Sequence, residues 1–183
     1  GLTFDNAWAY PVCSPTRSSI LTGRHGFRTG VLSAVPPENA IPMGETSLHA
    51  LLAARASYNS ALIGKWHLSG SSNGDADSPA RLGIDHYAGL LTGSHQSYHT
   101  VRLTQNGVGS TVNQYATTLF TDLALSWLED QASPWFLWLA YTAPHAPFHL
   151  PPDSLHYSQG LSDDPAAIDA DPLSYYLAML EAM

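Results

Sequence analysis

The sequence predicts an α/β fold with a mostly parallel central sheet flanked by helices. Two stretches carry this prediction, residues 48–63 and residues 113–141, because in each an amphipathic helical pattern precedes a short apolar run. Polar side chains follow both apolar runs, with Lys65 and His67 after the first and His145 after the second. Ligands of open α/β sheets bind at the carboxyl ends of the strands, so the same pattern indicates where a functional site should lie.

The bulk properties of the chain suit one domain of ordinary size. It has 183 residues, of which 44% are apolar, and this is enough for a hydrophobic core. Charged residues make up only 12%, and the formal net charge of −8 argues against nucleic acid or an anionic membrane surface as a partner. No run of 18 apolar residues is present, so we expect no membrane span.

The first predicted helix follows the only cysteine of the chain. Ser14 is a good N-cap, Pro15 then falls at the first helical position, and Gly23 is a typical helix stop. Cys13 would therefore lie beside the free N–H groups at the start of a helix, and Arg17 could turn toward the same place. These features predict an anion site that contains a reactive group.

The next elements lead to the first predicted strand. Residues 24–42 contain several Gly and Pro without a sustained period, which favours a surface loop. Ser47 and its neighbours can cap a helix that ends near Arg55. Residues 59–63 are mainly apolar and are followed by Gly64, which is typical of a buried parallel strand.

The second half of the chain repeats this order. Residues 69–79 are rich in Ser, Gly and Asp and predict a flexible loop, and residues 82–109 predict short strands and turns. A helix is predicted over 113–131, because apolar residues recur there every three to four positions, and Pro134 ends it. Residues 135–141 are uniformly apolar, which favours a central strand of the sheet.

The ends of the chain look like cuts within a longer protein. The acidic segment 162–171 should be irregular, and Pro172 should open a helix that runs to Met183 without a stop signal. The first residue is Gly1, with no starting Met and no basic leader. We therefore expect the chain to be incomplete at both ends.

A single cysteine serves either as a small buried hydrophobe or as a reactive group. It cannot form an intrachain disulfide or supply a thiolate cage for zinc. Cysteine phosphatases place more residues between their Cys and Arg than the three that separate Cys13 from Arg17, so that chemistry is set aside.

The stretch from Cys13 to Arg17, Cys-Ser-Pro-Thr-Arg, followed by Ile-Leu-Thr-Gly at 20–23, resembles the signature of the sulfatase family. The resemblance implies that a formylglycine-generating enzyme oxidises Cys13 to formylglycine (3-oxoalanine). It also implies that Arg17 and a divalent cation, Ca²⁺ or Mg²⁺, hold the resulting aldehyde hydrate, with position 13 among the cation's ligands. A hydrated aldehyde can attack sulfur and then expel sulfate, which a plain thiol cannot do.

Two further motifs are similar to family elements. Gly-Lys-Trp-His-Leu at 64–68 resembles the second sulfatase motif, in which Lys65 and His67 would stabilise charge on the sulfate oxygens. Pro-His-Ala-Pro at 144–147 resembles the third, in which His145 would serve the leaving oxygen or the sulfate. One departure is Ser57, where the family usually has Gly before the aromatic residue.

The remaining histidines are expected to be structural. His145 and His149 are four residues apart, as in a zinc pair on a helix, but Pro144 and Pro147 disfavour a helix there. His149 is therefore expected to be incidental. Four others are assigned to packing: His86, His95, His99 and His156.

The resemblance implies a partial alkaline-phosphatase-like sandwich, with residues 1–183 as the N-terminal portion of a sulfatase catalytic domain. The aspartate and asparagine residues with which sulfatases bind their cation match nothing in this chain. We therefore expect hydrolysis of sulfate esters by the whole protein and little turnover by the chain alone. The expected partners are a sulfated small molecule or glycan and the formylglycine-generating enzyme.

Two alternatives stay open on the sequence alone. A phosphonate monoester hydrolase or phosphodiesterase of the same superfamily would share the fold and the formylglycine. A non-catalytic fragment that only binds anions would keep Cys13 as an unmodified thiol. The compartment is not readable from the sequence, although the family makes an exported or periplasmic protein plausible.

Overall fold

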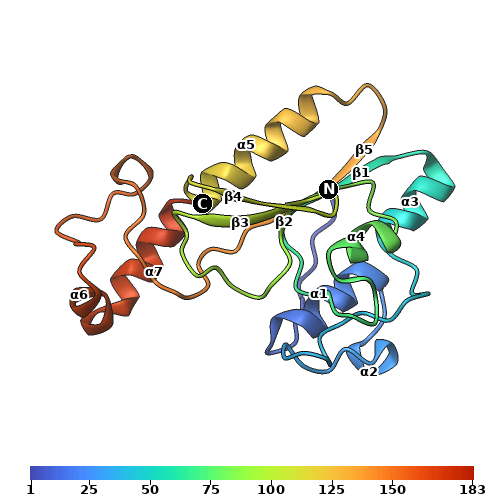
Figure 1. Cartoon of the computed structure of the whole chain (residues 1–183), viewed down its shortest axis with the longest axis horizontal. Coiled ribbons are helices and arrows are strands. Elements are labelled where there is room, and N and C mark those ends of the chain that lie inside the picture. Colours follow the sequence, from blue (N-terminus) through green and yellow to red (C-terminus); the bar gives the residue numbers. More distant parts are fainter.

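The computed structural model describes all residues 1–183 as an α/β fold with helices on both faces of one sheet (Figure 1). The sheet has five strands in the order β4-β3-β2-β1-β5. The sheet is mixed: β1 pairs in parallel with β2 and β5, whereas β2 with β3 and β3 with β4 are antiparallel. The strands are β1 (Asn59–Lys65), β2 (His86–Leu90), β3 (Val101–Gln105), β4 (Val108–Val112) and β5 (Trp135–Ala140).

The helices lie on opposite sides of this sheet. Figure 1 shows α5 above it and α1, α2 and α4 below it. The helices are α1 (Cys13–Thr22), α2 (Gly26–Thr29), α3 (Leu48–Ala56), α4 (Ser78–Arg81), α5 (Ala116–Glu129), α6 (Pro165–Ala170) and α7 (Pro172–Glu181). None of them combines the length and the apolar character that crossing a bilayer requires.

Strand β1 separates two hydrophobic cores. Ile63 belongs to the core that includes Phe120 of α5 and Met179 of α7. Leu62, the neighbouring residue, belongs to the core that includes Leu21 of α1. Side chains alternate between the two faces of a strand, so a strand covered on both faces must be apolar throughout. The predicted buried parallel strand is confirmed, and it extends two residues further, to Lys65.

Strand β5 does not have the central position predicted for it. It pairs only with β1 and forms an edge of the sheet, and Trp135 at its start is exposed. Uniform apolarity shows that a strand has two covered faces, but it does not show how many neighbouring strands it pairs with. The prediction of the strand is therefore right and that of its place in the sheet is wrong.

Two segments predicted as loops are better packed than expected. Residues 24–42 include α2, and their side chains Val31 and Ile41 are fully buried below the sheet. In the Ser/Gly/Asp-rich loop after Leu68, Asn73 is buried and its amide donates to the carbonyls of Ile41 (2.8 Å) and Leu68 (2.7 Å). Isolated apolar or amide residues carry no period, so their burial could not be predicted.

In three of the helices, a side chain caps the N-terminus with a hydrogen bond. The Ser47 hydroxyl accepts from the Ala50 N–H at the start of α3, as predicted. Asp171 caps α7, which begins at Pro172 as expected. Asp164 caps α6, a short helix in the segment that was predicted to be irregular. Asp followed by Pro is a helix-start signal, so this element could have been found from the sequence.

Candidate active site around Cys13

The start of α1 holds Cys13 at the carboxyl edge of the sheet. Helix α1 begins at Cys13 itself, with Val12 as the N-cap residue, and ends at Gly23 in the left-handed conformation. Ser14 is therefore not the N-cap that the sequence predicted. Its buried hydroxyl donates instead to the carbonyl oxygen of His67, at 2.9 Å. The Cys13 side chain is half-buried, beside the N–H groups that the first turn leaves unpaired.

Strand β1 and the residues after it place Lys65 and His67 close to Cys13. Lys65 is the last residue of β1 and is buried, and the fully buried Trp66 follows it. The Trp66 indole N–H donates to the Ser78 hydroxyl of α4, at 2.8 Å. His67 has a φ of +58°, so the backbone turns here and leaves the extended conformation of β1. Trp66 thus fixes the backbone between the two polar side chains.

Direct contacts join the start of α1 to the residues that follow β1. The Cys13 Sγ atom lies 3.1 Å from Nδ1 of His67. These residues are 54 positions apart in the chain. Together with the Ser14 hydrogen bond, this contact fixes the His67 ring and backbone against the first turn of α1.

Arg17 binds the backbone at the end of β1. Its Nε–H donates to the Trp66 carbonyl at 2.7 Å, and its Nη2 group donates to the Lys65 carbonyl. The guanidinium carbon lies 4.8 Å from the centre of the Trp138 ring of β5, a cation–π distance. Arg17 is thus a positioning residue for Lys65 and His67 as well as a positive charge near Cys13.

Burial and the repulsion between neighbouring positive charges lower the pKa values of the site residues. Burial lowers the pKa of Arg17 to about 10, and burial also lowers the pKa of Lys65, an effect that the nearby Cys13 opposes. The pKa of His67 falls to about 4, mainly through burial and further through the charges of Lys65, Arg17 and His145. His67 is therefore a neutral imidazole at pH 7, next to two cationic side chains.

His145 lies at the same edge but contacts none of the other candidate residues through a hydrogen bond. It is exposed in the loop after β5, and its Nδ1 lies 2.8 Å from the Ala146 carbonyl. Its backbone carbonyl accepts from the Tyr98 hydroxyl at 2.7 Å. The site therefore brings Cys13, Arg17, Lys65 and His67 together, with His145 close enough to influence the pKa of His67.

Gly93 is a site residue that sequence reasoning missed. A Cβ atom at this position would lie 2.4 Å from Cε1 and 2.7 Å from Nε2 of His67, so the Gly93 backbone covers the imidazole ring. Next to it in the loop, His95 is buried with Nε2 3.1 Å from the Thr142 hydroxyl. The sequence places Gly93 only in a region of short strands and turns, and no pattern links it to a residue 26 positions earlier.

His149 packs instead of pairing with His145. Its ring stacks on Tyr98 at 4.2 Å between centroids, and its Nε2 lies 3.1 Å from the Tyr115 hydroxyl. No three His, Cys, Asp or Glu side chains of residues 1–183 come close enough together to hold a metal ion. Arg17 and Lys65, the charged neighbours of Cys13, are cations, so the residues present do not fit a divalent cation.

His149 should make the folded protein sensitive to acid. Burial lowers its pKa from 6.5 to about 4, so the unfolded chain binds a proton more readily between these pH values. The free energy of unfolding should therefore fall as the pH falls from 6.5 toward 4. In His149→Gln, the melting temperature measured by circular dichroism should decline less over this range than in the wild type. The exposed His25→Gln is the control, and equal slopes for wild type and His149→Gln would contradict the prediction.

Comparison with known proteins identifies the family. The family model "Sulfatase" matches residues 1–183. The uncharacterized sulfatase YdeN of Escherichia coli is 30% identical over 184 residues, covering 87% of this chain and 32% of that protein. The N-acetylglucosamine-6-O-sulfatase of Bacteroides thetaiotaomicron is 31% identical over 160 residues, covering 82% of this chain and 26% of that protein. The chain thus spans about a third or less of the length of these relatives.

Solved structures agree with this assignment. BT4656, in complex with its substrate D-glucosamine-2-N,6-O-disulfate, is 28% identical with a TM-score of 0.67, over 82% of this chain and 29% of that one. Ps i-CgsB has a TM-score of 0.71 at 24% identity, over 94% of this chain and 42% of that one, which confirms the alkaline-phosphatase-like fold. With its Cys-Ser-Pro-Thr-Arg helix start packed against Lys65 and His67, the chain belongs to the sulfatase family.

Proposed function

We propose that this chain carries the nucleophile and part of the sulfate-binding residues of an enzyme that hydrolyses sulfate esters. The observation that supports this most is the contact between Cys13 and His67, with Arg17 and Lys65 beside them. The chain as a whole has a net charge of −8, so two cations gathered at one half-buried nucleophile position form a local anion site.

Each side chain has a defined task in this proposal. Conversion of Cys13 to formylglycine would supply a hydrated aldehyde as the nucleophile. The Lys65 ammonium stabilises negative charge on the sulfate oxygens, and Arg17 holds the Lys65 and Trp66 carbonyls so that this ammonium keeps its position. His67, neutral at pH 7, holds or accepts a proton at Nδ1, the atom that faces position 13. The exposed His145 serves the leaving oxygen.

The residues of this chain would not by themselves hold the divalent cation that the family implies. The family implies Ca²⁺ or Mg²⁺, whereas residues 1–183 present no cluster of carboxylates or imidazoles for such an ion. Since the metal ligands do not converge within this chain, the 183 residues alone should turn over sulfate esters far more slowly than the native protein.

The proposed substrate class is a sulfated sugar. One relative is named an N-acetylglucosamine-6-O-sulfatase, and BT4656 binds a disulfated glucosamine as its substrate. Both match more than four-fifths of this chain. A glucosamine 6-O-sulfate is therefore the first glycan to test, beside a simple aryl sulfate.

The experiment measures activity and the chemical state of Cys13 in the same samples. The native protein is expressed with and without a formylglycine-generating enzyme and assayed on aryl sulfate, glucosamine 6-O-sulfate and an aryl phosphonate monoester. We expect sulfate ester hydrolysis only with the maturation enzyme, together with a Cys13 peptide that has lost sulfur and two hydrogens and gained one oxygen, as conversion of the CH2–SH group to an aldehyde requires. Cys13→Ala should abolish this activity.

Other outcomes separate the competing functions. A higher kcat/KM on the phosphonate would indicate a phosphonate hydrolase of the same superfamily. A Cys13 peptide that stays a thiol in the presence of the maturation enzyme, with no hydrolysis of any ester, would overturn the proposal and favour an anion-binding protein.

A further inference from the structure

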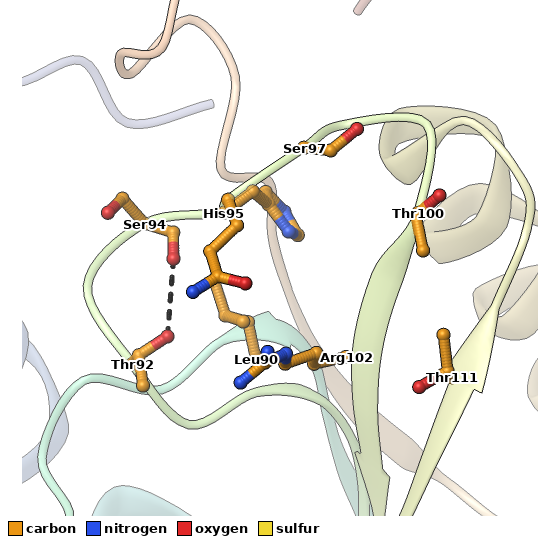
Figure 2. A pocket seen from close by; sticks show the side chains of 9 residues that line it. Leu90, Thr92, Ser94, His95, Ser97, Thr100, Arg102 and Thr111 are labelled. Atoms are coloured by element: carbon orange, nitrogen blue, oxygen red, sulfur yellow. Dashed lines mark hydrogen bonds between the residues drawn. The ribbon is translucent and has the colours of Figure 1, made fainter.

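A polar cavity of about 540 Å³ lies between the loop after β2 and the β3–β4 hairpin (Figure 2). Figure 2 shows Thr92 and Ser94 on one side of it and Thr100 and Thr111 on the other. Leu90 is the only hydrophobic residue in its wall. The Thr92 and Thr100 hydroxyls already donate, to the Ser94 carbonyl (3.2 Å) and to Oδ1 of Asn113 (3.3 Å), and so can only accept from a ligand. The Ser94 and Thr111 hydroxyls have no partner in the chain and can both donate and accept, so the wall suits a ligand that is itself rich in hydroxyl groups.

The cavity also contains a cation that has no partner in the chain. The Arg102 side chain is exposed into it, and no hydrogen bond or salt bridge within residues 1–183 involves its guanidinium. No Asp or Glu lies in the cavity wall. This is notable in a chain with 15 acidic and only 7 basic residues. A free guanidinium in a wall without carboxylates is suited to bind an anion.

The strand register places this cavity next to the candidate active site. Leu90, in the cavity wall, is the β2 partner of Lys65, and the His67 N–H donates to the Leu91 carbonyl at 3.1 Å. Continuing the antiparallel register of β2 and β3 sets Arg102 opposite Leu91. Two strand spacings, on the order of 10 Å, therefore separate the backbones of His67 and Arg102. This is about the span of one sugar unit with its substituents.

His95 links the cavity to the site more closely. It lies in the cavity wall, and its Nε2 is 3.1 Å from the Thr142 hydroxyl in the loop that carries His145. The loop after β2, which carries His95, also holds Gly93 against the His67 ring. A ligand in the cavity would thus contact the segment that positions His67.

From this arrangement we infer that the cavity is a substrate subsite, in which Arg102 binds a second anionic group carried by the sugar whose sulfate ester reacts at Cys13. The facing hydroxyls bind the hydroxyl groups of the same sugar or its neighbour. The inference rests on the proposed function and extends it, because it makes the preferred substrate a sugar with two anionic groups. The second group is a sulfate or a carboxylate, since both match a guanidinium in the same way.

The test compares matched substrates and matched arginine variants in the native protein. The probes are glucosamine 6-O-sulfate, glucosamine 2-N,6-O-disulfate and a 6-O-sulfated disaccharide that carries a uronic acid. The wild type should prefer at least one dianionic probe over the monosulfate, and Arg102→Ala should lower this preference about tenfold. Arg55→Ala is the control, because Arg55 is also exposed and without partners but lies at the end of α3.

The possible results separate this inference from the proposed function. A preference for the disulfate identifies sulfate as the second anion, and a preference for the disaccharide identifies the carboxylate. If the wild type hydrolyses all probes with similar kcat/KM and Arg102→Ala changes nothing, the subsite is wrong while the proposed function stands. If no ester is hydrolysed, the proposed function fails, and titration calorimetry decides on the subsite. Weaker binding of the dianionic probes by Arg102→Ala supports it, and equal affinity overturns it.

Discussion

Arg17→Ala in the native protein should lower kcat/KM for sulfate ester hydrolysis by about 10²- to 10³-fold. The substitution removes the positive charge near Cys13 and both hydrogen bonds to the end of β1. The carbonyls of Lys65 and Trp66 then lose their partners, which costs about 1–3 kcal/mol each in a buried setting. We therefore expect a lower melting temperature as well as a lower rate.

Two controls distinguish a loss of position from a general loss of stability. Arg17→Lys keeps the positive charge, but an ammonium cannot bind both carbonyls as the planar guanidinium does. It should therefore be almost as destabilised as Arg17→Ala and should also be much slower than the wild type. Arg55→Ala removes an exposed arginine and should change neither quantity. Activity of Arg17→Ala within tenfold of the wild type, measured well below its melting temperature, would contradict the role assigned to Arg17.

Gly93→Ala should reduce kcat/KM about 10²-fold while leaving the fold intact. The new methyl group would occupy the space of the His67 ring, which must therefore move away from the first turn of α1. Displacement of a catalytic group by about 1 Å costs about this much. Steady-state kinetics should show the loss mainly in kcat, because Lys65 still binds the sulfate and Arg17 still holds the end of β1 in place.

The matched control for this substitution is Gly109→Ala. Gly109 lies in β4, where an added Cβ meets nothing within 4 Å. Its kinetics should equal those of the wild type, and both variants should melt within a few degrees of it. If Gly93→Ala has wild-type kinetics, the packing of the loop on His67 has no part in catalysis.

The position of the site could be predicted from the sequence because its residues lie where a helix begins and where a strand ends, and local patterns mark both points. A buried apolar strand followed by Lys65 and His67 indicates that both residues lie at the carboxyl edge of a sheet, and the structure has them there. Cys13 is predicted at a helix start for similar local reasons, and α1 begins at this residue. Gly, Pro and apolar periodicity are sufficient signals in each case.

The contacts within the site could not be predicted in this way. Serine is acceptable both at the N-cap and two residues later in the first turn, so the sequence could not show that the Ser14 hydroxyl bonds to His67. Arg17 is expected from the sequence to face an anion, yet two of its N–H groups bind carbonyls 48 and 49 positions away. Such partners depend on how β1 docks against α1, a tertiary property with no local pattern.

The pairing of β1 with β5 also affects when Trp138 can pack against Arg17 during folding. Asn59 pairs with Trp135, across 76 positions of chain, and Trp138 of β5 lies against Arg17. Parallel strands with such large sequence separation close slowly, because the entropy of the intervening chain is lost before their contacts form. Helices such as α1 and α5 depend on local hydrogen bonds and can form much earlier. A partly folded chain can therefore contain most of its helical structure and still lack the Trp138 ring that packs against Arg17.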